Sequence, residues 1–381
     1  MTANSPYDRT DAATSVAPSW NDDRSVDVLQ VVTDDDRRGA QVFARDLHEA
    51  LETTGVGVRT VALARGASGG LDVPVLGERR LGRATLAALR RECSRASVVV
   101  AHGSTTLPAC AIATLGTRAP FVYRQISDSL FWAPRRTQRL RVSAGLARAA
   151  AVVALWSGSA RTLETHFHVA RRKLHVIPNG VPTDDFAPVE GPRRGASRER
   201  LGLDPARPTA LSLGALVPEK GVDLAIDAIA ARPDLQLLVV GDGPERRSLE
   251  ARAAARAPGR VRFTGPVASP RTAYEAADVV ILPSRGGDSM PAVLIEAGLM
   301  ALPSIATPVG GIPEIVIDGH TGALVPVGAL DELVEALDRI TGDAGRAAEL
   351  GEHARRHCVE RFGIDTVATQ WSGVLRAVAR S

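Results

Sequence analysis

The stretch V-D-V-L-Q-V-V at residues 26–32, with G-A-Q-V-F-A-R-D-L-H-E-A-L at residues 39–51, sets the pattern for the whole chain. The first run is short and rich in β-branched residues, which predicts a buried strand. The second run repeats its apolar residues at helical spacing, which predicts an amphipathic helix. A strand followed by a helix, repeated along a chain, indicates a parallel sheet with right-handed crossovers.

This alternation runs through the chain twice. Further strand-like runs in the first half lie at residues 58–63, 97–102, 120–124, 151–156 and 173–180. A polar segment at 191–200, rich in Arg and Gly, is the best linker candidate. The pattern then restarts, with strand-like runs at 209–216, 235–243, 261–266, 278–284 and 303–309. We therefore expect an α/β protein with two Rossmann-like, doubly wound parallel-sheet domains facing a cleft, and ligands outside the carboxyl ends of the strands.

The pattern also suggests a division of the chain. Residues 1–25 are polar and are expected to form an unfolded tail. The N-terminal domain is expected to span residues 26–188 and the C-terminal domain residues 189–361. A C-terminal helix is expected over 362–381, with a return of this helix to the N-terminal domain left open.

Composition excludes several classes of protein. The apolar fraction of 45% is that of a soluble globular protein. Three cysteines, an odd number without metal-ligand spacing, argue against disulfides and a zinc site and fit a reducing compartment. The sequence shows neither a signal peptide nor an apolar run of the ~20 residues that cross a bilayer. We expect a cytoplasmic protein, and the net charge of +3 gives no sign of a nucleic-acid partner.

The positive charge is uneven, with 13 arginines against two acids between Arg79 and Arg148. Within this region, F-W-A-P-R-R-T-Q-R-L-R at 131–141 mixes Phe131 and Trp132 with four arginines. Such a mixture suits contact with the inner membrane surface or with a phosphate-bearing acceptor. The alternative is a solvated helix rich in Arg, which we favour.

Three loops in the second half carry the candidate chemistry. They are L-G-A-L-V-P-E-K-G at 213–221, V-V-G-D-G-P-E at 239–245 and D-S-M-P-A-V-L-I-E-A-G at 288–298. All three follow predicted strands, so they are expected to open on the same rim of the sheet. A lysine beside glycine turns and helix N-termini suits a pyrophosphate, and Lys220 is one of only two lysines in the chain.

The third loop also holds two carboxylates, Asp288 and Glu296. Pro291 suits the first turn of a helix and Ser289 can cap it, which places Asp288 in the loop and Glu296 on the second turn. Eight helical residues span ~12 Å, whereas the two carboxylates of a glycosidase lie ~5–9.5 Å apart, although the loop shortens the span.

A single extended ligand with one carboxylate at each end is the more natural interpretation. The N–H groups of Ala292 and Val293 then lie between the carboxylates and point at phosphate. Taken alone, Asp288 is better explained as a turn residue and Glu296 as a solvated helix acid, and it is their combination with Lys220 and the flanking turns that favours a functional role.

Six motifs in order resemble the family-4 glycosyltransferases of the GT-B architecture, which use nucleotide-sugar donors and retain the anomeric configuration. The resemblance covers nearly everything after residue 25. The motifs are R-G-A at 38–40, V-I-P-N-G-V at 176–181, L-V-P-E-K-G at 216–221, V-V-G-D-G-P at 239–244, D-x7-E at 288–296 and P-V-G-G-I-P-E at 308–314. Each one is weak alone, and their order and spacing make the set specific.

The resemblance implies that the N-terminal domain binds the acceptor and the C-terminal domain the nucleotide sugar. It implies catalytic roles for Lys220 at the donor diphosphate, Asp288 at the sugar hydroxyls and Glu296 at the ribose. The implied donor-binding residues are Gly39, Gly214, Lys220, Met290, Ala292, Val293 and Glu296. Gly39 matches a first-loop glycine that lets the acceptor domain approach the diphosphate, and Met290, Ala292 and Val293 match backbone donors.

The chain departs from the family pattern at three places. Asp288 stands where the first carboxylate is usually Glu, and Ala215 stands where Arg usually follows Gly214. Arg124 follows Tyr123, where the family often has a histidine. Arg124 and His102, a strand-end residue facing the cleft, are the candidate acceptor contacts. A purely structural role for His102 is an equal alternative.

The function expected from this resemblance is transfer of a sugar to a hydroxyl acceptor, which is a glycan, a lipid or a small molecule. No cofactor or metal is expected. D-D-D at 34–36 is read as a polar loop rather than a metal-binding D-x-D motif, and G-D-G at 241–243 lacks the spacing of a dinucleotide fingerprint. Two alternatives stay open: a non-catalytic protein that binds a sugar nucleotide, motivated by Ala215, and a sugar-nucleotide epimerase. Polysaccharide biosynthesis is the expected setting.

Overall fold

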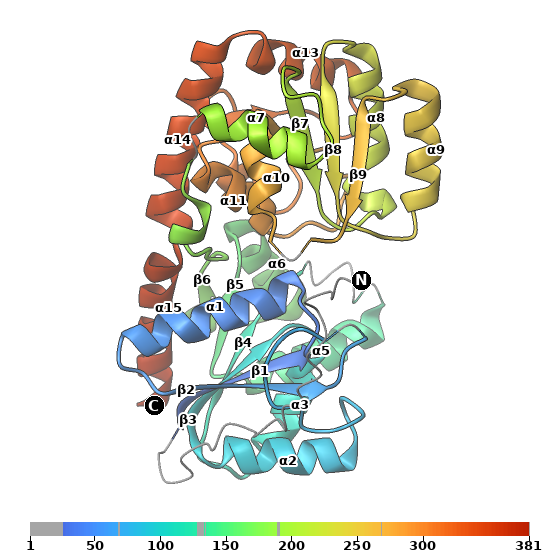
Figure 1. Cartoon of the computed structure of the whole chain (residues 1–381). Coiled ribbons are helices and arrows are strands. Elements are labelled where there is room, and N and C mark those ends of the chain that lie inside the picture. Colours follow the sequence, from blue (N-terminus) through green and yellow to red (C-terminus); the bar gives the residue numbers. More distant parts are fainter. Residues whose placement is uncertain are drawn as a thin grey trace, which may run out of the picture.

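The protein consists of two α/β domains stacked one above the other (Figure 1). The computed structural model describes residues 26–67, 69–127, 133, 135–188, 191–267 and 269–380. The predicted tail, residues 1–25, lies outside the described residues. Each domain contains a six-stranded sheet in which neighbouring strands pair in parallel, so the predicted fold class is confirmed.

The N-terminal sheet has the strand order β2-β1-β3-β4-β5-β6. Its strands are β1 (Val26–Asp34), β2 (Val58–Ala64), β3 (Ala96–His102), β4 (Phe121–Arg124), β5 (Ala151–Ala154) and β6 (Leu174–Val176). Its helices are α1 (Gly39–Thr53), α2 (Arg83–Cys93), α3 (Thr106–Ala113), α5 (Arg136–Arg148) and α6 (Ser157–Phe167), with the short helix η1 (Arg171–Lys173). The inner strands are almost continuously apolar because helices cover both faces of the sheet.

The C-terminal sheet has the strand order β12-β11-β10-β7-β8-β9. Its strands are β7 (Thr209–Leu213), β8 (Gln236–Val240), β9 (Val261–Gly265), β10 (Val279–Leu282), β11 (Ser304–Ala306) and β12 (Gly322–Leu324). Its helices are α7 (Gly191–Arg200), η3 (Pro218–Lys220), α8 (Val222–Ala231), α9 (Arg246–Arg256), α10 (Arg271–Ala276), α11 (Ala292–Leu299), α12 (Ile312–Ile315), α13 (Leu330–Thr341) and α14 (Ala344–Phe362). The strand order reverses between β7 and β10, and this is where ligands bind in doubly wound sheets.

The segment predicted to be the linker is a helix, so that prediction is wrong. Residues 191–200 form α7, which packs on α10. The Arg198 side chain is buried, donates to the Ala276 carbonyl at 2.9 Å and pairs with Asp278. Arg194 and Arg198 therefore serve internal contacts with Asp278, and the number of arginines in this segment does not indicate an exposed linker.

The chain crosses between the domains twice, and the two crossings are bonded to each other. Val181 donates its N–H to the Phe362 carbonyl at 2.9 Å, and Ile364 donates to the Val181 carbonyl at 3.0 Å. Helix α15 (Ile364–Ala379) follows α14 directly and packs against α1 of the N-terminal domain (Figure 1). The last helix of the chain therefore belongs to the core of the first domain.

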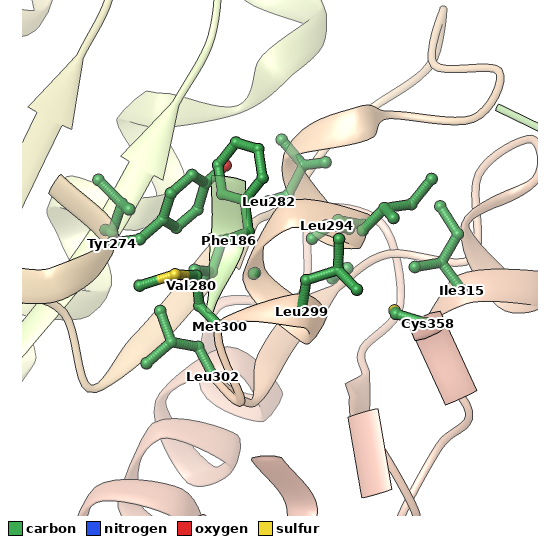
Figure 2. Close-up of a cluster of buried hydrophobic side chains, with 14 of the residues drawn as sticks. Phe186, Tyr274, Val280, Leu282, Leu294, Leu299, Met300, Leu302, Ile315 and Cys358 are labelled. Atoms are coloured by element: carbon green, nitrogen blue, oxygen red, sulfur yellow. The ribbon is translucent and has the colours of Figure 1, made fainter. Parts of the chain in front are cut away.

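A buried cluster in the C-terminal domain holds the first crossing in place. Phe186, in the short helix η2 (Asp184–Phe186), meets Tyr274 edge to face with ring centroids 5.9 Å apart. Figure 2 shows both rings beside side chains of the sheet and of α11. The segment that leaves the N-terminal domain is thus anchored by aromatic packing close to α11.

We expect the Trp371→Ala variant to be less stable by about 3–5 kcal/mol, because a large side chain is lost from the core. Trp371 on α15 is 0% exposed and belongs to the apolar cluster that covers the N-terminal sheet. Denaturant unfolding measures the change. The exposed neighbour Gln370 provides the control, since Gln370→Ala is expected to alter stability by less than about 0.5 kcal/mol. Equal effects of the two substitutions would show that α15 is not part of this core.

Candidate functional site

The loops after β7, β10 and β11 meet at one edge of the C-terminal sheet. These three strands are neighbours and run in parallel, so their carboxyl ends lie side by side. The loops carry Lys220, Asp288 and Gly310, respectively. The structure therefore brings together residues that are far apart in the sequence.

Lys220 and Asp288 form a direct ion pair. The Lys220 ammonium donates to one carboxylate oxygen of Asp288, and the Ser284 hydroxyl donates to the other. The Asp288 side chain is 8% exposed and the Lys220 side chain 22%. The carboxylate is thus fixed in orientation, while the Lys220 side chain stays partly exposed.

Two glycines allow the neighbouring loops to close on the loop of Asp288. Gly221 has φ +66°, and a Cβ there would lie 2.2 Å from the Pro283 carbonyl oxygen. Gly310 has φ +58°, and a Cβ there would lie 2.0 Å from the Asp288 carbonyl oxygen. Only glycine fits such approaches without displacing the backbone.

Helix α11 begins at Ala292 with an uncapped end. Pro291 is the N-cap residue, and no side chain in the described part of the chain caps the helix. The predicted cap by Ser289 is wrong, because its hydroxyl donates instead to the Ile126 carbonyl of the N-terminal domain at 2.9 Å. The first N–H groups, those of Ala292 and Val293, have no acceptor within the helix and suit an anion.

Glu296 lies on the second turn of α11, as predicted, and is half-buried. It accepts a hydrogen bond from the Tyr274 hydroxyl at 2.7 Å. Burial raises the pKa of Glu296 to about 7, and the negative charge of Asp46 on α1 adds to this, against the lowering effect of the Tyr274 hydrogen bond. Glu296 therefore changes its charge near neutral pH.

The two carboxylates occupy unlike environments. Asp288 is paired with a cation, whereas Glu296 is held by a neutral phenol. They flank the free N–H groups of α11, so one elongated ligand can reach all three. Met290, between them, is 2% exposed, and its carbonyl accepts from the Asn179 amide at 2.6 Å.

Of the three predicted residues in the N-terminal domain, one begins a helix and two end strands. Gly39 begins α1, is exposed and has open space around its Cα. His102 and Arg124 end β3 and β4 and are each 1% exposed. Arg124 Nη1 lies 3.3 Å from His102 Nδ1, and Arg124 Nη2 donates to Asn179 Oδ1 at 2.5 Å. Both ring nitrogens of His102 and both Nη atoms of Arg124 thus face protein partners.

The D-D-D run at 34–36 is bonded to protein donors. Asp34 pairs with Arg38 and Arg80 at 3.4 and 2.8 Å, and Asp36 pairs with Arg38. Asp35 accepts from the Gly66 N–H. Across the residues that the structure describes, no group of three or more His, Cys, Asp or Glu side chains is arranged to hold a metal ion.

Position 215, where the family usually has an arginine, is occupied by Ala215 and therefore supplies no cation. Gly214 has φ +147°, and Ala215 beside it is exposed. The nearby guanidinium of Arg285 is bound by Asp223 through two hydrogen bonds of 2.8 and 2.7 Å. Lys220 is therefore the cation that the loop after β7 supplies.

The basic segment at 131–141 is described only in part. Phe131 and Trp132 lie outside the described residues. Arg136, Leu140 and Arg141 are exposed on α5, and Leu140 is 73% exposed. Among the helices that the structure describes, none combines the length and apolar character needed to span a bilayer.

Three supporting residues were not predicted. Ser284 ends the strand-like run at 278–284 and Asn179 lies within V-I-P-N-G-V, and neither segment gave any sign of their contacts. Tyr274 has no motif around it. Its link to Glu296 arises from the packing of α10 against α11 and is not encoded in local spacing.

Comparison with known proteins identifies relatives of both halves of the chain. A profile described as Glycosyltransferase Family 4 matches residues 37–185, and one described as Glycosyl transferases group 1 matches residues 193–357. Alpha-maltose-1-phosphate synthase of Mycobacterium tuberculosis is 34% identical over 223 residues, covering 54% of this chain and 57% of that protein. D-inositol 3-phosphate glycosyltransferase of Streptomyces avermitilis is 33% identical over 252 residues, covering 62% and 53%. The chain thus spans little more than half the length of these relatives.

Solved structures share the whole fold. The structure of Anabaena HepE in complex with UDP-glucose has a TM-score of 0.81 and 22% identity, covering 92% of this chain and 99% of that one. Sucrose-phosphate synthase from Thermosynechococcus elongatus has a TM-score of 0.79 and 22% identity, covering 93% and 99%. At this identity, the similarity establishes the two-domain architecture.

We expect Glu296→Gln to be more stable than the wild-type protein at alkaline pH. A carboxyl whose folded pKa is raised binds its proton more tightly in the folded state, so stability falls as pH rises from the unfolded pKa through the folded one. That interval runs from about 4.3 to the folded value of about 7. Glutamine stays neutral and still accepts from Tyr274. Thermal unfolding between about pH 5.5 and about pH 8.5 measures the difference, which should grow with pH.

The control for this experiment is Glu352→Gln, because Glu352 is exposed on α14. Its difference from the wild-type protein is expected to stay constant over the same range. A constant difference for Glu296→Gln as well would contradict the titration of Glu296 near neutral pH.

Proposed function

The chain belongs to the family-4 glycosyltransferases of the GT-B fold, and from this membership we propose that it moves a sugar from a nucleotide-sugar donor to a hydroxyl acceptor with retention of configuration. The observation that carries the proposal is the arrangement of Lys220, the free N–H groups of α11 and Glu296 along one rim of the C-terminal sheet. A cation, N–H donors and a carboxylate in this order match a diphosphate followed by a ribose.

The donor lies mainly on the C-terminal domain. Its diphosphate takes the Lys220 ammonium and the N–H groups of Ala292 and Val293, where the helix dipole adds favourable charge. The ribose hydroxyls donate to Glu296, and the sugar hydroxyls donate to Asp288. Solved relatives support this class of donor, since HepE was determined with UDP and with UDP-glucose.

The ion pair of Lys220 and Asp288 prepares the site for such a donor. Without ligand, the pair keeps both side chains oriented along the rim. A diphosphate shares the ammonium with Asp288, and Ser284 keeps the carboxylate in place while this happens. The side chain of Asp288 is shorter than that of the usual Glu, and its carboxylate is held in one orientation by Lys220 and Ser284.

The reaction follows from these contacts. The acceptor oxygen forms a bond to the anomeric carbon on the face from which the diphosphate leaves, and the bond from that carbon to the phosphate oxygen breaks. The leaving diphosphate takes the electron pair, and an oxygen on it accepts the acceptor's proton. Lys220 and the helix terminus stabilise the negative charge that develops, which is electrostatic catalysis by preorganised groups. Asp288 and Glu296 supply orientation.

The acceptor lies on the N-terminal domain, across the cleft from the donor. Relatives are named as an alpha-maltose-1-phosphate synthase, a D-inositol 3-phosphate glycosyltransferase and a phosphatidylinositol monomannoside mannosyltransferase, so glycan, lipid and small-molecule hydroxyls all belong to the proposed range. A cytoplasmic role in polysaccharide biosynthesis completes the proposal. No metal takes part in it, because Lys220 and the N–H groups provide the positive charge.

Removing either the Lys220 ammonium or the Glu296 carboxylate, which binds the ribose, is expected to abolish sugar transfer without unfolding the protein. Lys220→Ala should lower kcat by about 100-fold or more, because one preorganised charge contact is lost at the leaving group. Glu296→Ala should also abolish turnover. Release of nucleoside diphosphate measures the rate, and circular dichroism with thermal unfolding checks the fold.

The matched control is Lys173→Ala, which removes the chain's other lysine. Its ammonium bonds to the carbonyls of Ala147 and Ala149, in the N-terminal domain, and has no part in the proposed site. Transfer by this variant should match that of the wild-type protein. Undiminished transfer by Glu296→Ala counts against the site described above.

The same assays separate the proposal from its rivals. Calorimetry that detects nucleotide-sugar binding, combined with an assay that finds no release of nucleoside diphosphate with or without acceptors, favours a binding protein. Interconversion of the donor sugar without an acceptor favours an epimerase. Acceptor-dependent release of nucleoside diphosphate supports the glycosyltransferase.

A further inference from the structure

A buried arginine stands at the junction of the two domains without a carboxylate partner. Arg124 is 1% exposed, and its guanidinium lies over the Phe43 ring at 3.8 Å from the ring centroid. Among the residues that the structure describes, no Asp or Glu forms an ion pair with it, and its Nε has no hydrogen-bond partner. A buried cation of this kind is costly, so its contacts call for a functional explanation.

On one side, Arg124 is fixed by a chain of buried hydrogen bonds within the N-terminal domain. The Gln30 amide nitrogen donates to the Ala44 carbonyl at 2.9 Å, which directs the Gln30 oxygen to His102 Nε2, also at 2.9 Å. His102 Nε2 therefore carries the proton, and Nδ1 is left to accept from Arg124 Nη1 at 3.3 Å. Burial and the Arg124 charge lower the pKa of His102, which keeps this ring neutral.

On the other side, Arg124 holds the segment that joins the domains. Its Nη2 donates to Asn179 Oδ1 at 2.5 Å, and the Asn179 amide nitrogen donates to the Met290 carbonyl at 2.6 Å. The Asn179 N–H also approaches the Met290 sulfur at 3.4 Å. Two residues later, Val181 is bonded to the second crossing of the chain at Phe362 and Ile364. Asn179 thus sits on a fixed backbone and bridges two domains with one side chain.

The loop that Asn179 reaches is the one that carries Asp288. Ser289, between Asp288 and Met290, bonds to the N-terminal domain through the Ile126 carbonyl at 2.9 Å. From the C-terminal domain, Gly311 donates its N–H to the Ser289 carbonyl at 2.5 Å. The loop is therefore held from the N-terminal domain at two points within two residues of Asp288.

We propose that Arg124 and Asn179 are positioning residues that set the Asp288–Met290 loop from the N-terminal domain, so that the grip on the donor sugar depends on how the two domains meet. This inference rests on the proposed function. Arg124 was expected from the sequence to contact the acceptor, but its buried guanidinium is bonded to His102 and Asn179, so in this proposal neither Arg124 nor Asn179 touches the donor or the acceptor. Arg124 acts through Asn179, and Asn179 acts through the Met290 carbonyl. The nucleotide half of the site, at Glu296 and the N–H groups of α11, lies outside this chain of hydrogen bonds.

The pattern of donors explains why these residue types are needed. Arginine donates in two directions from one planar group, so it can contact His102 and Asn179 together. Asparagine accepts with its oxygen and donates with its nitrogen, which joins a donor on one domain to a carbonyl on the other. An aspartate at 179 would keep the contact with Arg124, as an ion pair, and lose the hydrogen bond to the Met290 carbonyl.

The test is therefore Asn179→Asp. The buried Arg124 gains a counter-charge, so thermal stability should equal or exceed that of the wild-type protein. The Met290 carbonyl loses its donor and faces a carboxylate oxygen, so kcat should fall by about tenfold or more, while the Kd for UDP stays within about twofold. The donor is the nucleotide sugar with the highest wild-type rate in a panel that includes UDP-glucose.

The matched control is Glu314→Gln, which alters a different contact between the domains. The Glu314 side chain accepts from the Ser157 N–H at 3.0 Å, and the amide oxygen of glutamine can do the same. Its kcat and its Kd for UDP should both stay within about twofold of the wild-type values. A second comparison measures kcat for Arg124→Met, for Asn179→Ala and for the double variant that carries both substitutions. If the two residues act in one chain, the double variant has the kcat of Asn179→Ala alone.

Three results would overturn the inference. A wild-type kcat for Asn179→Asp shows that the loop does not depend on Asn179. Parallel loss of stability, UDP affinity and kcat shows a purely structural role. Additive losses in the double variant show that Arg124 and Asn179 act separately. A wild-type protein that neither binds nor consumes any nucleotide sugar instead removes the proposed function, and this inference with it.

Discussion

Parallel strands place all their carboxyl ends on one edge of a sheet, and this chain turns two such edges toward each other. Ile126 follows β4 and accepts from Ser289, which follows β10, while Ser157 follows β5 and donates to Glu314, which follows β11. Loops that contribute little to the core of either domain therefore lie on both sides of one interface. The site is a consequence of this arrangement, since its charged residues come from separate loops that only the sheet edge brings together.

Within the site, the distribution of charge differs between the two carboxylates. Asp288 is compensated by Lys220 without any ligand, so the rim beside β10 is close to neutral. Glu296 has no cationic partner among the residues that the structure describes, and burial raises its pKa to about 7. A bound diphosphate adds negative charge next to Lys220, and ribose hydroxyls offer Glu296 the hydrogen bonds that ionisation favours. Without ligand, the polar groups of the site are therefore already oriented. Their strongest interactions form only when the diphosphate and the ribose bind.

The sequence was informative where local pattern determines structure. The alternation of strands and helices predicted both sheets, and the strand-end positions of Lys220 and Asp288 predicted that they would lie on one rim. It was uninformative where a contact depends on tertiary packing. Residues 191–200 look like a polar linker but form a helix, because their arginines bind inside the domain. The Ser289 hydroxyl was expected to cap α11, yet it bonds across the domain interface. Tyr274 carries no local signal at all, since its role exists only once α10 packs beside α11.

The direct test of this account is a crystal structure of the protein grown with a nucleotide sugar that it binds. The account predicts density along the rim of the C-terminal sheet, with the diphosphate between the Lys220 ammonium and the first N–H groups of α11, and with ribose hydroxyls on Glu296. Ligand density elsewhere on the molecule, with Lys220 still bonded only to Asp288 and Glu296 still bonded only to Tyr274, would contradict it.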